Sequence, residues 1–97
     1  MLTRKFIIVD VRDNVATSVQ PIARGEALEV QEGGPAGALV ISDNIPFGHK
    51  FALVAIGVGD PVIKYGETIG VASATISPGE HVHVHNVEGV RGRGDKL

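Results

Sequence analysis

Glycine and proline are spaced so closely along this chain that they leave no clean window for a long helix. The 97 residues include 13 glycines and five prolines, and both residue types weaken or break a helix interior. Between them lie short segments rich in β-branched residues, several of which alternate with the period of two of a half-buried strand. The sequence therefore predicts an all-β fold with seven or eight short strands. The segments are KFIIVDV, NVATSV, ALEV, ALVIS, FALVAI, PVIKY, TIGVASA and HVHVHNV.

One turn pattern occurs four times, as Ile, two residues, Gly, two residues and an apolar residue. We expect the Ile to be buried at the end of one strand, the Gly to have positive φ, and the apolar residue to return to the core. The copies start 23, 11 and 20 residues apart, which argues against the fixed period of a solenoid. They favour turns of one compact β domain. The four copies are IARGEAL, IPFGHKF, IGVGDPV and ISPGEHV, and they begin at Ile22, Ile45, Ile56 and Ile76.

Length and composition indicate one domain, which we place at residues 1–90, with a polar tail at 91–97. The net charge of −2, the pI near 6.0 and the absence of tryptophan give no sign of a nucleic-acid partner. No cysteine is present, so a disulfide framework and a Cys-ligated zinc site are excluded. The N-terminus lacks the apolar stretch of a signal peptide, and no apolar run is long enough to span a membrane. We therefore expect a cytoplasmic protein.

Three of the four histidines alternate with valine at positions 81, 83 and 85. On an extended strand, alternate residues share one face, with Cβ atoms roughly 6.6 to 7 Å apart. Neighbouring imidazoles at this spacing can bind one metal ion, although three from one straight strand rarely converge. A ligand from a second strand would complete such a site, and His49 lies in the second turn copy beside Lys50. The alternative interpretation is an exposed polar face.

Four motifs occur together within residues 44–86, namely Gly48-His49-Lys50, Lys64-Tyr65-Gly66, Ile69-Gly70 and the run HVHVHN at 81–86. With these motifs, the segment resembles the N-terminal domain, or separate small subunit, of the altronate and galactarate dehydratase family. Upstream, the segment RDNVATSVQPIARGEAL is similar to the opening strand and first turn of that family, so the resemblance covers nearly the whole chain. The resemblance implies the SAF-domain fold, a β-clip in which strands form a long, folded hairpin.

The resemblance also implies the elimination of water from a sugar acid to give a 2-keto-3-deoxy acid, with a divalent metal, commonly Fe2+. Such an elimination needs a base for the α-proton, a cation that stabilises the enediolate, and an acid or metal for the leaving hydroxide. Lys50 would neutralise a substrate carboxylate or be a solvated lysine, and His81 is the most expendable histidine. Carried over by position, the site residues are His49, Lys50, His83, His85 and Asn86, with His83 and His85 as metal ligands.

In single-chain members of the family a much larger domain follows this module. We therefore expect this chain to be a small subunit that docks on a separately encoded large subunit and contributes its histidines to a shared site for a sugar acid. Two alternatives stay open: the alpha subunit of a sulfolactate sulfo-lyase, which eliminates sulfite, and a non-enzymatic SAF carbohydrate-binding module. The sugar acid, the leaving group, the metal, the base and the formation of a homo-oligomer also stay open.

Two further segments have structural interpretations. The loop QEGGPAG at 31–37 is rich in glycine but lacks the Lys-Ser/Thr of a phosphate-binding loop, so we expect a flexible connection. Lys64 and Tyr65 are expected at a strand end and turn, with Tyr65 packed in the core.

Overall fold

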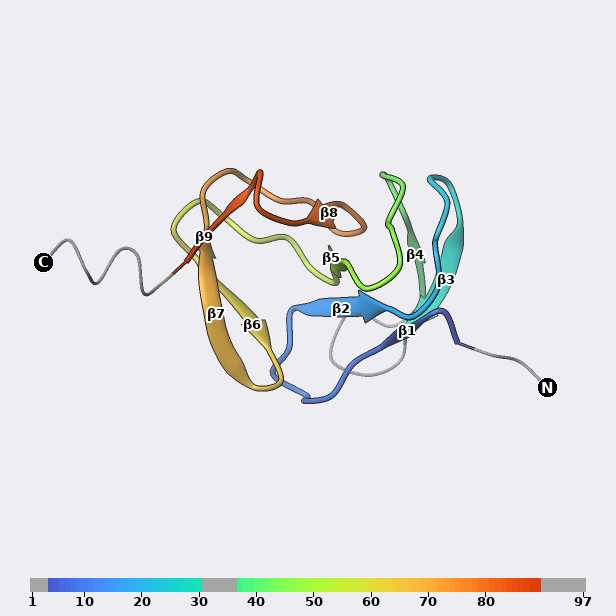
Figure 1. Cartoon of the computed structure of the whole chain (residues 1–97), viewed down its shortest axis with the longest axis horizontal. Coiled ribbons are helices and arrows are strands. Elements are labelled where there is room, and N and C mark those ends of the chain that lie inside the picture. The colour runs from blue at the N-terminus through green and yellow to red at the C-terminus, as the bar shows by residue number, and fades with distance from the viewer. Residues whose placement is uncertain (1–3, 31–36, 90–97) are drawn as a thin grey trace, which may run out of the picture.

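The computed structural model describes residues 4–30 and 37–89, which form nine short strands and no helix (Figure 1). The predicted all-β class is therefore confirmed, and within these residues no helix could span a membrane. The loop predicted at 31–37 lies outside the described residues except for Gly37, which begins a strand, and the tail at 91–97 lies outside them as well. The strands are β1 (Phe6–Ile7), β2 (Val15–Ser18), β3 (Ala27–Val30), β4 (Gly37–Val40), β5 (Lys50–Ala52), β6 (Pro61–Lys64), β7 (Glu67–Ala72), β8 (His81–Val82) and β9 (Val87–Gly89).

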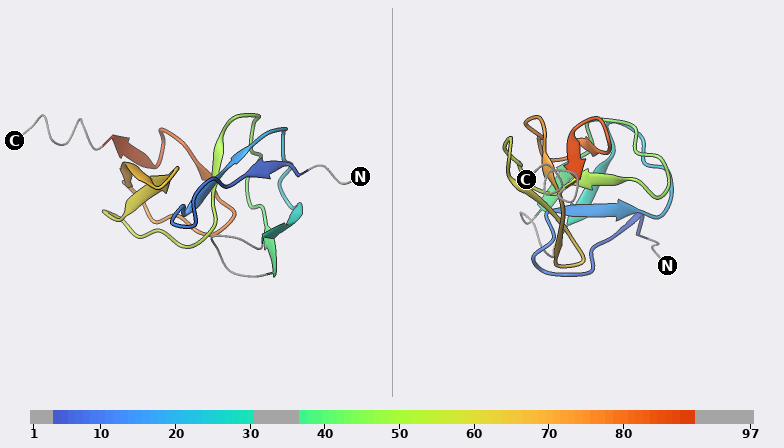
Figure 2. Two further views of the ribbon diagram at one scale, coloured as in Figure 1. Left: turned by 90° about the horizontal axis from the view of Figure 1, so that it is seen from below. Right: turned by 60° about the vertical axis from the view of Figure 1, so that its left-hand side comes forward.

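The strands pair antiparallel in three small sheets. The central sheet has the order β1-β2-β5-β8, a second consists of the hairpin β3-β4, and a third has the order β6-β7-β9. Figure 2 shows the central sheet between the two hairpins, with β3-β4 at one end and β6-β7 at the other. Isolated antiparallel bridges join Ile22 to Ile45 and Ile56 to Ile76, so the four turn copies meet in pairs. This interleaved arrangement agrees with the expected β-clip.

The four turn copies have the predicted conformation. Their glycines, at positions 25, 48, 59 and 79, have φ between 83° and 93°, and each initial Ile is at most 2% exposed. At Gly79 a side chain is excluded by contact as well as by backbone conformation, because a Cβ there would collide with the carbonyl oxygen of Val40. Each turn thus requires its glycine, and its apolar ends anchor it in the core.

Two apolar clusters form the core, and the same two strands contribute to both. In β2, Val15 belongs to one cluster and Ala16 to the other, and in β5 Ala52 and Phe51 are divided in the same way. This division follows from the alternation of side chains across a strand. Phe51 is fully buried and packs edge-to-face on Phe6, with ring centroids 5.6 Å apart. The central sheet therefore ties the two ends of the molecule together.

The prediction of one continuous strand over HVHVHNV is wrong. β8 ends at Val82, residues 83–86 form a turn, and β9 begins at Val87 in a different sheet. The turn is closed by a hydrogen bond from the backbone N–H of Asn86 to the carbonyl of His83. One predicted segment thus supplies two strands, which is why the structure has nine.

Candidate functional site

The second turn copy differs from the other three at the residue after its glycine. In the other copies this residue is Glu26, Asp60 or Glu80, whose carboxylate accepts a hydrogen bond of 2.6 to 3.1 Å from the backbone N–H three residues earlier. The second copy has His49 instead, and the residue three positions earlier is Pro46, which has no N–H to donate. This turn therefore lacks both partners of the bond, and the ring of His49 is free to point elsewhere.

Pairing of β5 with β8 places His49 beside His83. The two strands are antiparallel with Lys50 opposite Val82, so the same register brings His49 opposite His83, one residue beyond the strand ends. Cross-strand neighbours of this kind have side chains in contact. The two imidazole rings stack with centroids 4.1 Å apart and planes 16° apart.

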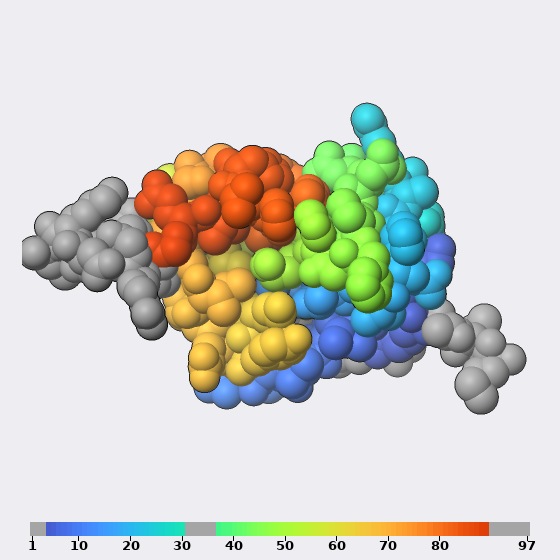
Figure 3. Space-filling view, in the orientation of Figure 1, coloured from blue at the N-terminus to red at the C-terminus, as the bar shows by residue number. Residues whose placement is uncertain are grey.

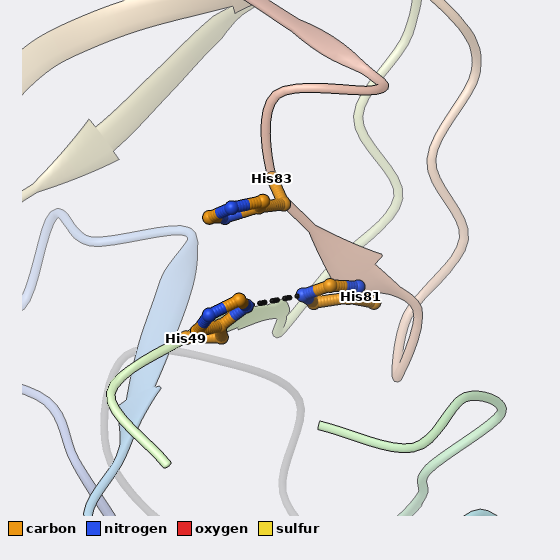
Figure 4. A group of neighbouring side chains, drawn as sticks. All are labelled: His49, His81 and His83. Atoms are coloured by element: carbon orange, nitrogen blue, oxygen red, sulfur yellow. Dashed lines mark hydrogen bonds between the residues drawn. The ribbon is translucent and has the colours of Figure 1, made fainter. Parts of the chain in front are cut away.

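His81 supplies a third ring to the same place (Figure 4). Its Nε2 lies 2.9 Å from Nδ1 of His49, a hydrogen bond in which one ring donates its N–H and the other accepts it. One nitrogen from each of His49, His81 and His83 lies within 4.8 Å of the others, the one such group found among the described residues. We call these three residues the histidine cluster. His81, which the sequence interpretation treated as expendable, is half-buried and belongs to this cluster.

Burial and mutual repulsion favour the neutral form of two of these rings. The pKa of His81 lies below its usual value, first because of burial and then because of the neighbouring histidines, against which Asp43 acts in the opposite direction. The pKa of His83 is lowered by burial and then by His49 and Lys50. Neutral imidazoles keep a lone pair at neutral pH, so they can bind a metal ion or accept a proton.

Asn86 holds the backbone that carries the cluster. Its side chain is buried, with the residue 2% exposed; Nδ2 donates to the carbonyl of His81 at 2.9 Å, and Oδ1 accepts from the N–H of His83 at 3.0 Å. Both the oxygen and the nitrogen of this side-chain amide are therefore occupied by hydrogen bonds to the backbone of the residues that carry the rings. This placement points to support of the cluster rather than contact with a ligand.

Asp43 is a second support, which the sequence interpretation missed. Its Oδ2 accepts a hydrogen bond of 3.0 Å from the backbone N–H of His81. The two residues are 38 positions apart, and no spacing or motif in the sequence links them. Only the packing of the loop before the second turn copy against β8 makes the contact.

A cavity of about 260 Å³ opens beside the histidine cluster. Lys50 projects into it from β5, and its ammonium group has no hydrogen-bond or ion-pair partner among the described residues. Burial, and then the charge of Lys64, lower the pKa of Lys50. An unpaired cation beside an imidazole suits the acid group of a small organic ligand. The cavity is lined by Lys50, Ile69, His83, Val84, Val87 and Gly89.

His85, Lys64 and Tyr65 lie outside the histidine cluster and do not line the cavity. His85 is exposed, and its ring centroid is 5.4 Å from that of His81, outside the cluster of three, because the chain turns after His83 instead of continuing straight. Lys64 ends β6, as expected, and its ammonium group lies 4.8 Å from the ring centroid of Tyr65. The expected core packing of Tyr65 is wrong, because this residue has φ of 57° in the turn and is 50% exposed.

Comparison with known proteins identifies the family of the chain. Residues 4–90 match the family described as the altronate/galactarate dehydratase SAF domain. The altronate dehydratase of Bacillus subtilis is 40% identical over 85 residues, which is 88% of this chain but 16% of that protein. The altronate dehydratase of Escherichia coli is 39% identical over 84% of this chain and 16% of its own length. The (2R)-sulfolactate sulfo-lyase subunit alpha of Chromohalobacter salexigens is 36% identical over 86% of this chain and 92% of its own length. The chain thus spans about a sixth of the dehydratases that it matches.

Proposed function

The chain belongs to the family of altronate/galactarate dehydratase SAF domains, and from this premise we propose that it is the histidine-bearing small subunit of a lyase that acts on sugar acids. The observation that carries the proposal is the convergence of His49, His81 and His83 beside Lys50, which has no partner among the described residues. The chain matches only 16% of each altronate dehydratase, so we place the rest of the active site on a larger polypeptide.

The histidine cluster fits a divalent metal ion. Three imidazoles suit zinc, copper, iron or nickel, so the Fe2+ implied by the family resemblance is compatible with them. Nitrogen ligands about 2.0 to 2.1 Å from a tetrahedral ion lie about 3.4 Å from one another, and the cluster has its nitrogens within 4.8 Å. Small side-chain rotations would therefore close the site, in which three protein ligands leave a position for substrate. A bound ion would supply Lewis acidity at the carboxylate and the leaving group of the substrate.

The other residues have separate roles in this proposal. Lys50 binds the carboxylate of the acid and orients it toward His83 across the cavity. His85, exposed and 5.4 Å from His81 between ring centroids, would carry a proton to or from the reacting acid, or reach the metal ion after a rearrangement of the turn. Asn86 and Asp43 hold the backbone of the cluster, so they are positioning residues.

A sulfolactate sulfo-lyase is the second candidate. The alpha subunit from Chromohalobacter salexigens is matched over 92% of its own length, so this relative has the same small-subunit organisation as the one we propose. Both reactions remove a proton beside a carboxylate, and they differ in the group that leaves. The histidine cluster and Lys50 would serve either reaction.

Metal titration of the purified chain tests the first part of the proposal. After treatment with a chelator, we expect the chain to bind Co2+, as a spectroscopic probe, with absorption bands typical of nitrogen ligands. His49→Ala, His81→Ala and His83→Ala should each weaken Co2+ binding by at least about tenfold. A loss of about tenfold in metal affinity is already typical when a residue that only hydrogen-bonds to a metal ligand is mutated. Lys50→Met should leave Co2+ binding unchanged, because Lys50 has no lone pair to offer at neutral pH.

Assay of the assembled enzyme tests the second part. The chain co-purified with its large partner should release a 2-keto acid from altronate or galactarate, or sulfite from sulfolactate, and the product distinguishes the two candidates. Each alanine variant of the cluster should lose this activity. A chain that binds no Co2+, and whose variants turn over at the wild-type rate, would contradict the proposal.

A further inference from the structure

Apolar side chains are exposed next to the histidine cluster. Val84 is 82% exposed at the tip of the turn after β8, and Ile69 is 39% exposed on β7. Together with Val87 of β9 they line the cavity into which Lys50 projects. We call these three residues the apolar wall. Exposed apolar groups that adjoin a polar site in this way are typical of surfaces that another molecule covers.

The apolar wall adjoins an unpaired strand edge. β9 is the last strand in the sheet order β6-β7-β9, so one of its edges has no strand partner among the described residues. In Figure 3 the segments of β7, of the turn after β8 and of the second turn copy meet on one face of the molecule. This face combines apolar anchors, the outer edge of the described sheet and a central polar group, which together resemble the anatomy of a protein interface.

Two observations indicate what covers this face. In the altronate dehydratases the matching region is 16% of a longer chain, whereas in the sulfo-lyase it makes up 92% of a protein named as a subunit. One domain is therefore used both within a longer chain and as a separate subunit, so in each case it needs a surface for the rest of the enzyme. The histidine cluster and the cavity beside it would hold the metal ion and the acid, and both need cover, because exclusion of water strengthens the electrostatic interactions of an elimination.

We propose that the apolar wall of Ile69, Val84 and Val87 is the docking surface for the larger polypeptide of the lyase, which closes the cavity over Lys50 and His83. The inference rests on the proposed function, since it takes the partner to be the rest of that enzyme. The partner presents an apolar surface, with Val84 as the central anchor because this residue projects furthest into solvent. Docking at this position would place the reacting acid between the two polypeptides.

Site-specific cross-linking in the native host tests the docking surface. A photoreactive phenylalanine is introduced at position 84 or 69, and at position 11 as the control. Val11 is 79% exposed, close to the value for Val84, and it lies in the loop between β1 and β2, on the opposite side of the molecule from β8 (Figure 1). Positions 84 and 69 should yield one larger cross-linked product, and position 11 should not.

Mass spectrometry of the cross-linked product decides the outcome. A partner whose sequence matches the part of altronate dehydratase that this chain does not cover supports the proposal. A cross-link to a second copy of this chain, to unrelated proteins only, to no protein, or equally from position 11 would overturn it. An intact cross-link in a complex that releases neither a 2-keto acid nor sulfite would leave the docking surface standing and remove the proposed function instead.

A charge substitution provides the matched quantitative test. Val84→Glu should weaken binding of the large polypeptide by roughly 30-fold or more, as for the loss of a buried interface anchor, while Co2+ binding by the cluster stays unchanged. Val11→Glu should change neither. Equal loss of Co2+ binding in Val84→Glu would instead show a local folding defect, and Ile69→Glu then provides the independent test. If neither glutamate variant weakens the complex, the docking surface is wrong.

Discussion

At position 49 the chain carries a histidine where its three related turns carry a carboxylate. Each carboxylate bonds to a backbone N–H within its own turn, and a bond of this kind contributes about 0.5 to 1.5 kcal/mol. The second turn cannot form this hydrogen bond, because Pro46 lacks the N–H donor and His49 lacks the carboxylate acceptor. Its backbone is held instead by Ser18, whose hydroxyl donates to the carbonyl of Pro46 at 2.6 Å. The histidine is thus available for the site without leaving an unpaired N–H.

A double-mutant cycle on the metal-free chain tests this account. Neither Pro46→Ala nor His49→Glu alone can form the bond, whereas the double variant can, so we expect a favourable coupling of about 1 kcal/mol in the free energy of unfolding. The cycle cancels the effect of proline on the unfolded chain. Thermal or urea unfolding of the four proteins provides the measurement. Zero coupling would mean that the second turn differs from the others in more than these two residues.

At the scale of elements, the short pair β5-β8 and the turn after it decide where the rings lie. β8 has only two residues, so its hydrogen bonds alone hold it weakly. The side chain of Asn86 closes the turn against the backbone of His81 and His83, and removal of a buried partner of this kind costs about 1 to 3 kcal/mol. The side chain of Asn86 therefore fixes the backbone of the cluster at the point where β8 ends.

Burial of His81, and then crowding by the neighbouring rings, predict a pH-dependent stability of the metal-free chain. The pKa of His81 in the folded chain lies below the value of 6.5 expected when unfolded. Between these two values the unfolded chain binds a proton that the folded chain does not, so stability falls as the pH drops below 6.5 and levels off once the folded-state pKa is passed. We expect the melting temperature to fall from pH 7.5 to pH 5.5.

The variant His81→Gln isolates this effect. It removes the titrating ring, so its melting temperature should fall less over the same pH range, with the chelator present throughout. A variant with the same pH dependence as the wild type would show that other groups, and not His81, govern the change.

For the whole molecule, cooperativity depends on the central sheet. β2 and β5 each place one side chain in one apolar cluster and the next side chain in the other. Neither cluster can lose its packing without disturbing strands that the other needs. A domain of this size also has a small free energy of unfolding, so the loss of either cluster is expected to unfold the whole domain.

We therefore expect a single unfolding transition, even when only one cluster is damaged. Leu53→Ala acts in the apolar cluster that contains Phe51, and Ile76→Ala acts in the one that contains Ala52. Both substituted residues are fully buried. Each variant should lose about 2 to 5 kcal/mol in the free energy of unfolding. NMR signals of Leu28 and Val62, one from each cluster, should disappear at the same temperature in both variants. Separate midpoints for the two signals would contradict the coupling.

The local sequence pattern predicts most of the strands and turns. For the site, it predicts which residues take part but not how they are arranged. The glycine turns and the strands between them could be predicted, because a positive φ and a period of two are properties of neighbouring residues. Membership of the site was predicted for His49, Lys50 and His83, since the motifs that contain them resemble those of the family. The prediction erred where it extended the strand through His85, because the turn at 83–86 depends on a buried amide bonded to the backbone.

Tertiary pairing decided which rings meet. His49 and His81 are 32 residues apart, and their contact arises from the antiparallel register of β5 and β8, which no local pattern encodes. The support from Asp43 and the apolar wall of Ile69, Val84 and Val87 have the same origin, since each joins segments that touch only after folding. A strand determines which side chains share a face, whereas the distance between rings on different strands is set by how those strands are packed.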